Sequence, residues 1–262
     1  MFERLQWIRA KPQAWTHWAP LNTGADVNGR LLAELGPRAS LVEADGVRQA
    51  LARELYAPPW WRWQRRQLAW QEPAQQSQGM VWANLVLHTQ LDPQALLLRW
   101  HGLLQVDGFL MFSCLGPDTA VEMRVLYDEL GWPAAGAQLT DMHDWGDMLV
   151  GCGFAEPVMD MERVTLTWTT PEAMLEELRT LGANLHPGRF PACRGRLWRA
   201  RLLATLRERL AGQDGRLALE FEIVYGHALR PAARPRVLPE SAVSLQEMRQ
   251  LLRGERPEGG TR

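Results

Sequence analysis

The spacing of apolar and polar residues changes repeatedly along the chain, and these changes predict where its strands and helices lie. Residues 109–114 form a short apolar run with a glycine beyond each end, which is typical of a buried strand. Asp107-Gly108 precedes the run as a turn, and residues 116–119 end it and begin a helix. Polar side chains therefore follow the carboxyl end of a strand, where open α/β sheets bind ligands.

The same patterns predict alternating strands and helices over most of the chain. Further strands are expected at residues 14–19, 39–44, 67–70, 79–87, 158–168 and 217–225. Helices are expected at residues 2–9, 25–35, 47–56, 93–104, 119–130, 140–150, 171–181 and 194–210. This order predicts an α/β fold, a doubly wound and mostly parallel sheet with helices on both faces.

The length of 262 residues is consistent with one large domain, which we place at residues 1–252. A tail helix is expected at residues 241–252, where Ser244 and Glu247 form a capping box, and residues 253–262 are expected to be disordered. Residues 58–78 are rich in proline and glutamine and suggest a loop. Its tryptophans between Trp60 and Trp70 are interpreted as core filling or as a contact surface.

Charge and cysteine content exclude several classes of protein. The formal net charge is -1, so no global charge favours nucleic acid or an anionic membrane. The three cysteines are far apart and show neither a disulfide framework nor zinc spacing, so no metal is expected. No long apolar segment is present, and a cytoplasmic location is the default expectation.

Three long phrases identify a family resemblance: FLMFSCLGPDTAVEMR from Phe109, TDMHDWGDMLVGCGFAEPVMDMERVTLTW from Thr140 and FEIVYGHAL from Phe221. They resemble the class I S-adenosylmethionine methyltransferases of biotin synthesis, which methylate the free carboxyl of a malonyl group on acyl carrier protein. The resemblance implies a Rossmann-like fold with a mostly parallel seven-stranded sheet and a helical insertion before the last strand. It also implies a cofactor half at residues 1–115 and a substrate half at residues 116–230.

The resemblance implies that S-adenosylmethionine binds at the carboxyl ends of the first strands. The expected cofactor residues are Thr23 and Gly24 after the first strand, Asp45 after the second and Asn84, which matches the family's strand-end asparagine, in the next buried strand. Asp45 has a helix N-cap as its alternative role, and Asn84 has that of a satisfied buried amide.

The loop after the first strand departs from the glycine-rich pattern of the family. Trp18 stands where the family has an acid, and Pro20 and Asn22 stand where it has glycines. Proline lacks an N–H and adds bulk where a cofactor needs close approach to the backbone. We therefore expect S-adenosylmethionine binding to be weak or absent.

Four residues are candidates for the acceptor site: Arg124, His143, Tyr225 and His227. Arg124 could pair with a carboxylate through two hydrogen bonds, which suits a malonyl group. His143 and its neighbouring aspartates have helix capping as an alternative role. Tyr225 and His227 could equally form a structural pair. No residue is singled out as catalytic, because methyl transfer from a sulfonium depends mainly on alignment.

Residues 189–209 contain seven arginines against one acid. A solvated helix face explains this pattern, and a dock for an acidic partner such as malonyl-acyl carrier protein is the functional alternative. The arginines expected to contact it are Arg194, Arg196, Arg199 and Arg201. The two functional hypotheses are thus a carboxyl methyltransferase with a changed cofactor loop and a non-catalytic, protein-binding or assembly module.

Overall fold

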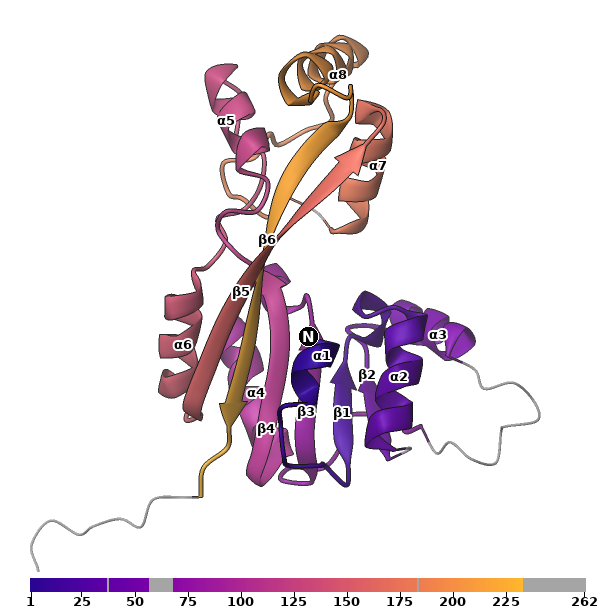
Figure 1. Cartoon of the computed structure of the whole chain (residues 1–262), viewed down its shortest axis with the longest axis vertical. Coiled ribbons are helices and arrows are strands. Elements are labelled where there is room, and N and C mark those ends of the chain that lie inside the picture. The colour runs from indigo at the N-terminus through magenta and orange to yellow at the C-terminus, as the bar shows by residue number, and fades with distance from the viewer. Residues whose placement is uncertain (37, 57–67, 183, 233–262) are drawn as a thin grey trace, which may run out of the picture. The chain divides into compact units, whose positions relative to one another are not determined.

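A single sheet of six strands, in the order β2-β1-β3-β4-β6-β5, organises the part of the chain that the structure describes (Figure 1). The first four strands are parallel, β6 is antiparallel to β4, and β5 is antiparallel to β6. The strands are β1 (Trp15–Trp18), β2 (Ala39–Val42), β3 (Gln78–Asn84), β4 (Leu104–Leu115), β5 (Ala155–Trp168) and β6 (Leu217–Leu229).

The computed structural model describes residues 1–36, 38–56, 68–182 and 184–232. They fall within one compact unit, Met1–Ala232. The predicted tail helix at 241–252, the predicted disorder at 253–262 and the tryptophans of residues 57–67 lie outside the described residues. Within those ranges no helix is both long and apolar enough to cross a membrane.

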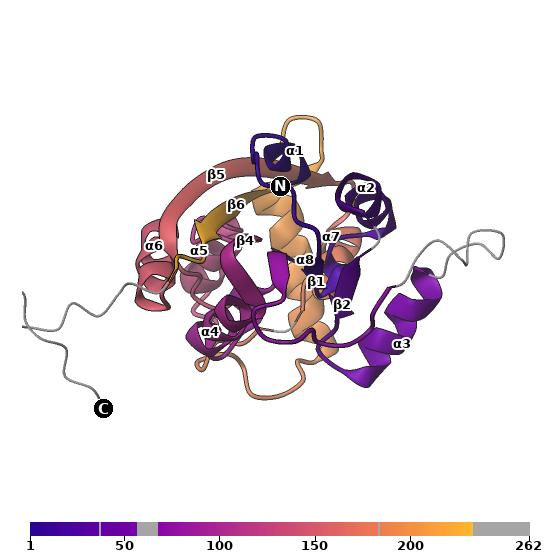
Figure 2. The same cartoon turned by 90° about the horizontal axis from the view of Figure 1, so that it is seen from below.

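Helices cover both faces of the sheet. Trp100 of α4 and Trp145 of α6 pack with Phe112 on one face, and Leu31 of α2 packs with Trp15 and Trp82 on the other. A third apolar cluster joins α5, α7 and α8 beyond the parallel strands, around the ends of β5 and β6 (Figures 1 and 2). The helices are α1 (Phe2–Leu5), α2 (Ala25–Leu35), α3 (Gly46–Leu55), α4 (Pro93–Leu103), α5 (Val121–Glu129), α6 (Met142–Gly151), α7 (Pro171–Thr180) and α8 (Arg196–Leu210), with the 3-10 turns η1 (Pro20–Asn22) and η3 (Leu87–Thr89).

Most predicted elements are present, and local chemistry explains their boundaries. The helix at Ala25–Leu35 has the predicted bounds. Asp92 caps α4 by accepting from the Ala95 N–H at 2.9 Å, and Pro93 occupies the first helical turn. Two predicted strands, 158–168 and 217–225, are longer in the structure because they pair with each other along almost their whole length.

The prediction of seven strands is corrected to six within the described residues. In the described part of the predicted strand at 67–70, residues 68–70, one isolated bridge is present, between Ser40 and Ala69. Ala69 donates to the Ala39 carbonyl at 3.1 Å and accepts from the Leu41 N–H at 2.7 Å. Pro73 follows closely and has no N–H to extend a ladder.

Two local predictions around β4 are also corrected. Asp107-Gly108, predicted as a turn before the strand, lies inside β4, with φ of 62° at Asp107. The helix predicted to begin at residues 116–119 starts at Val121, after Ala120, which is left-handed and makes no side-chain cap. Thr119 instead donates to the Glu222 carbonyl at 3.1 Å, so β6 holds this loop in place of a cap.

Candidate functional site

The strand order puts the topological switch point of the sheet between the carboxyl ends of β1 and β3, and this region is called the crevice below. The chain passes from β1 to β2 on one side and then crosses to β3 on the other side of β1. In an open parallel sheet, this reversal leaves a crevice between the loops that follow the two strands. Here those loops begin at Ala19 and Leu85.

The loop after β1 is tightly held from within the protein. Ala19 is left-handed, with φ of 50°, and Pro20 begins the 3-10 turn. The Tyr56 hydroxyl donates to the Pro20 carbonyl at 2.6 Å. Burial, together with the nearby negative charge of Glu43, raises the pKa of Tyr56 to about 12, so this hydroxyl keeps its proton at neutral pH.

Thr23 closes the same loop onto a buried histidine. The His17 ring lies 2.9 Å from the Thr23 hydroxyl through Nε2 and 2.8 Å from the Asn28 amide oxygen through Nδ1. Burial lowers the pKa of His17 to about 4, so the ring is neutral at pH 7. A neutral ring donates from one nitrogen and accepts at the other, which satisfies both neighbours.

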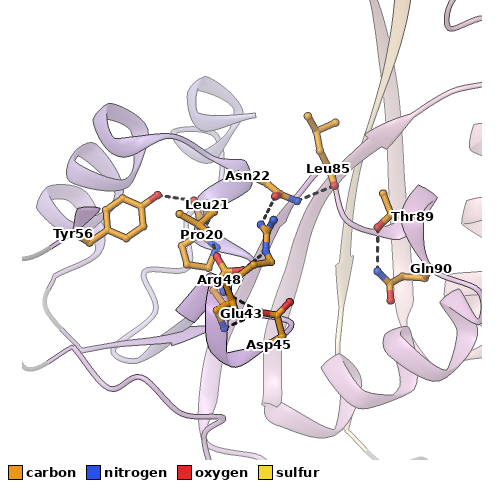
Figure 3. A network of polar contacts seen from close by, with 11 residues as sticks. Pro20, Leu21, Asn22, Glu43, Asp45, Arg48, Tyr56, Leu85, Thr89 and Gln90 are labelled. Atoms are coloured by element: carbon orange, nitrogen blue, oxygen red, sulfur yellow. Dashed lines mark hydrogen bonds and ion pairs between the residues drawn. The ribbon is translucent and has the colours of Figure 1, made fainter. Parts of the chain in front are cut away.

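Glu43 directly follows β2, and its side chain is 0% exposed. Its Oε1 accepts from the Leu21 N–H at 2.8 Å, and its Oε2 accepts from Nε of Arg48 at 2.9 Å. The same guanidinium donates through Nη2 to the amide oxygen of Asn22 at 2.7 Å (Figure 3). Both Glu43 oxygens are therefore used by the loop after β1 and by α3.

The Asn22 and Asn84 side chains carry this network across the crevice. Asn22 donates from its amide to the Leu85 carbonyl at 3.0 Å (Figure 3), and Asn84 donates to the Asn22 carbonyl at 2.8 Å. The amide oxygen of Asn84 accepts from the Ser113 hydroxyl at 2.6 Å. Hydrogen bonds thus run continuously over the carboxyl ends of β2, β1, β3 and β4.

The predicted cofactor residues lie at this carboxyl edge of the sheet, and each makes different contacts there. Asp45 caps α3, accepting from the Val47 and Arg48 N–H groups at 2.9 and 2.8 Å. Gly24 is the N-cap of α2, has φ of 83°, and has open space where a side chain would lie. Sequence analysis missed Glu43; its position immediately after the last strand residue is the signal that could have found it.

The two tryptophans of β1 do not fill the crevice. Trp15 packs in the core on the α2 face, and Trp18 lies on the opposite face with its ring edge-on to Trp100 at 5.8 Å. Successive strand residues point to opposite faces, so residues 15 and 18 must separate in this way. Among the described residues, polar side chains therefore line this edge, and the two indole rings of β1 do not.

A second site lies beside Arg124 on α5. A cavity of about 240 Å³ has His88 and Arg124 among its polar walls and Leu115, Met123 and Leu181 among its apolar ones. Arg124 donates to the carbonyls of Pro117 and Thr119, the second at 2.9 Å. These bonds hold the guanidinium at the wall of the cavity.

Sequence analysis also missed His88, which lies in η3 at the end of β3. Its Nδ1 accepts from the Leu115 N–H at 3.4 Å, and burial lowers the pKa of His88 to about 4. The neutral ring therefore carries its proton on Nε2. A ring donor and a guanidinium share the walls of one cavity, which suits a ligand with two oxygen-bearing groups.

The other predicted acceptor residues are elsewhere in the described structure. His143 is 80% exposed on α6 and pairs with Asp141, the helix cap, at 2.7 Å. The Tyr225 hydroxyl donates to Glu162 beneath Arg4, and burial raises the pKa of Tyr225. His227 packs against Phe109, and burial lowers the pKa of His227. None of the three lines the cavity beside Arg124.

Several arginines of residues 189–209 pair with acidic side chains or stack on aromatic rings. Arg207 and Arg209 pair with Glu172 and Glu129. Arg194 lies 4.3 Å from the Trp198 ring, and Arg201 lies 5.6 Å from that of Trp132. Arg196 and Arg199 are exposed and lie three residues apart on α8, so they share one face of the helix, whereas Leu197, which is 89% exposed, points to another side.

The six-stranded sheet with its crevice is the fold of class I S-adenosylmethionine methyltransferases. A protein from Bacillus halodurans C-125 described as a methyltransferase has a TM-score of 0.56 at 14% identity, covering 88% of this chain and 99% of its own. The YcgJ protein of Bacillus subtilis has a TM-score of 0.57 at 8% identity, covering 88% of this chain and 97% of its own. These likenesses establish the fold.

Sequence comparison identifies the family, although no family model matches the chain. A malonyl-[acyl-carrier protein] O-methyltransferase from Gallionella capsiferriformans is 38% identical over 244 residues, 89% of this chain and 82% of that protein. One from Legionella pneumophila is 30% identical over 89% of this chain and 82% of its own length. The chain therefore belongs to the malonyl-acyl-carrier-protein O-methyltransferase family.

The extent of the match differs between relatives. The family member from Laribacter hongkongensis is 47% identical over 161 residues, which are 61% of this chain and 54% of that protein. The chain thus spans about half of this relative and most of the Gallionella protein.

The residues at the crevice have the chemistry that an adenosyl donor needs. Glu43 and Asn84 supply acceptors at two strand ends, which suit ribose hydroxyls and an amine. The first turn of α2 begins at Gly24 without a side-chain cap, which suits a carboxylate. In this structure, however, the side-chain acceptors are engaged by the protein's own donors.

Proposed function

We propose that the chain transfers a methyl group from S-adenosylmethionine to the free carboxyl of a malonyl group carried on acyl carrier protein, a step of biotin synthesis. The observation that carries the proposal is the match to the Gallionella enzyme over 89% of the chain, which includes both halves of the fold. No observation favours the non-catalytic alternative over this function.

The crevice between β1 and β3 is the proposed donor site. Glu43, Asn84 and the amino end of α2 at Gly24 would hold the donor there, with Thr23 supporting the loop. When bound, S-adenosylmethionine supplies a methyl group already activated on a sulfonium. The protein then has to orient the acceptor and exclude water.

The cavity beside Arg124 is the proposed acceptor site. The guanidinium has donors that match a carboxylate, and the neutral His88 ring can donate to a carbonyl without adding charge. The apolar walls from Leu115, Met123 and Leu181 would exclude water from the acyl chain. Orientation of one carboxylate oxygen is the contribution to rate that we assign to Arg124.

The exposed face of α8 that carries Arg196 and Arg199 is the proposed dock for acyl carrier protein, because these two arginines have no acidic neighbour among the described ion pairs. Arg194 and Arg201 would support this face through their contacts with Trp198 and Trp132. Rim charges of this kind act mainly on association with an acidic partner.

Transfer of a labelled methyl group from S-adenosylmethionine to malonyl-acyl carrier protein tests the function. We expect a base-labile methyl ester on malonyl-acyl carrier protein and none on acetyl-acyl carrier protein, which has no free carboxyl. The absence of label from the malonyl acceptor at high donor concentration would refute the proposal.

The dock is tested by Arg199→Glu against Arg53→Glu, an equal charge reversal on α3. We expect a rise in KM of about 10-fold for malonyl-acyl carrier protein with Arg199→Glu, and no change for a malonyl-pantetheine acceptor. Equal effects of the two reversals would contradict the dock.

A further inference from the structure

The Asn22 side chain donates across the crevice to the Leu85 carbonyl, and Arg48 donates to the amide oxygen of Asn22 and to Glu43 from the β2 side (Figure 3). Resting on the proposed function, we propose that these two residues form a latch that excludes the methyl donor from the crevice and so set the affinity for it. The latch is defined as Arg48 and Asn22 with their partners Glu43 and Leu85.

The latch uses the same atoms that a donor would need. Arg48 and the Leu21 N–H occupy both oxygens of Glu43, the acid at the end of β2. Asn84, at the end of β3, donates to the Asn22 carbonyl and accepts from Ser113. Because the Glu43 side chain is 0% exposed, a nucleoside can reach its oxygens only after Arg48 or the loop after β1 has moved.

Asn22 also places the latch across the path of the ligand. Its amide belongs to the loop after β1 and reaches the carbonyl of Leu85, which follows β3. A single side chain thus ties together the two loops that border the crevice at the strand switch point. Glycine, the family residue at this position according to the sequence resemblance, has no side chain to make such a tie.

The latch can open without disturbing the core. Arg48 is 38% exposed and Asn22 is partly exposed, so both side chains can exchange their partners for water or ligand. Neither belongs to the apolar clusters that hold the sheet and helices together. A protein whose competent state is only fractionally populated binds its ligand more weakly by that fraction.

Calorimetric titration with S-adenosylhomocysteine tests the latch in the full chain. Asn22→Ala removes the bond to Leu85 and the partner of Arg48, and it keeps the Glu43–Arg48 pair. Arg48→Lys keeps a cation beside Glu43 and removes the planar fork that reaches Glu43 and Asn22 together. We expect both variants to bind at least about 10-fold more tightly than the wild-type chain.

Arg53→Ala is the matched control, because Arg53 lies on the same helix and faces Trp70 rather than the crevice. Its affinity should equal that of the wild type. Hydrogen exchange of residues 19–24 gives a second readout, and we expect faster exchange in Asn22→Ala than in Arg53→Ala.

The outcomes separate the latch from the proposed function. Equal, measurable affinity in wild type and both latch variants would overturn the latch and leave the proposed function standing. Absence of binding in every variant, with residues 19–24 opened in Asn22→Ala, would overturn both. Unchanged exchange together with unchanged affinity would show that these side chains do not hold the loop, which also overturns the latch.

Discussion

The two proposed ligand sites of this protein differ in how their polar groups are used. At the donor crevice, Glu43 and the Asn22 amide accept from Arg48, and Asn84 donates to the backbone carbonyl of Asn22, so these polar side chains are engaged within the protein. At the acceptor cavity, Arg124 and His88 border an open volume of about 240 Å³ and are held by backbone groups. The polar side chains at the donor crevice hold the structure together, whereas those at the acceptor cavity remain available for a ligand.

Removing the arginine of each site should reveal the largest difference between the two sites, in the free energy of unfolding. Arg48→Ala leaves the fully buried carboxylate of Glu43 without its cation, and we expect a loss of about 3 kcal/mol in the free energy of unfolding. Arg124→Ala removes only bonds to two carbonyls near solvent and should cost about 1 kcal/mol. Urea titration of both variants measures the difference. Equal losses would contradict the assignment of a structural role to the crevice alone.

Arg124→Ala, the less destabilising of the two substitutions, should have a large effect on activity. Loss of a charge-assisted pair with the malonyl carboxylate should lower kcat/KM by about 100-fold, because hydrogen bonds to charged groups contribute about 1.5–3 kcal/mol. Arg163→Ala provides the control, since Arg163 pairs with Asp118 in a neighbouring groove. A similar fall in both variants would place the effect in the fold around α5 rather than in the acceptor site.

Acid should destabilise both regions through their buried histidines. Burial lowers the pKa of His17 and of His88 to about 4, below the ordinary value of 6.5. The unfolded chain binds these protons first, so stability is complete above pH 6.5 and is lost as pH falls toward 4. We expect a loss of about 2 kcal/mol per histidine between pH 7 and pH 5. Urea titrations at both pH values would measure it, and His17→Gln should show a shallower loss; an identical slope would contradict the assignment.

Removing the helix caps Asp45 and Asp92 should produce the smallest difference in stability. Asp45→Ala and Asp92→Ala each remove an N-cap, and each should lower the free energy of unfolding by about 1 kcal/mol in thermal or urea unfolding. Asp45 lies beside the crevice and Asp92 does not. A much larger affinity change for S-adenosylhomocysteine with Asp45→Ala than with Asp92→Ala would show that Asp45, rather than Glu43, receives the ligand.

Local patterns were sufficient for the elements but insufficient for the contacts among them. The helix at Ala25–Leu35, the cap at Asp92 and the buried run of β4 depend on neighbouring residues, and all were predicted. The strand at 67–70 failed because a ladder needs a partner over several residues, and only Ala69 finds one. The helix start near Thr119 failed because Glu222, over a hundred residues away, holds that hydroxyl.

The sequence by itself determined the class of fold, the family and the position of the changed loop after the first strand. Those features depend on periodicity and on residue types at fixed spacing, which the chain carries locally. Only the tertiary structure decided that Glu43, directly after β2, accepts from Arg48 while Asp45 caps α3, and that Asn22 ties together the loops after β1 and β3. Hydrogen bonds between loops depend on where the strands place those loops in space, and sheet order is set by packing across the whole chain.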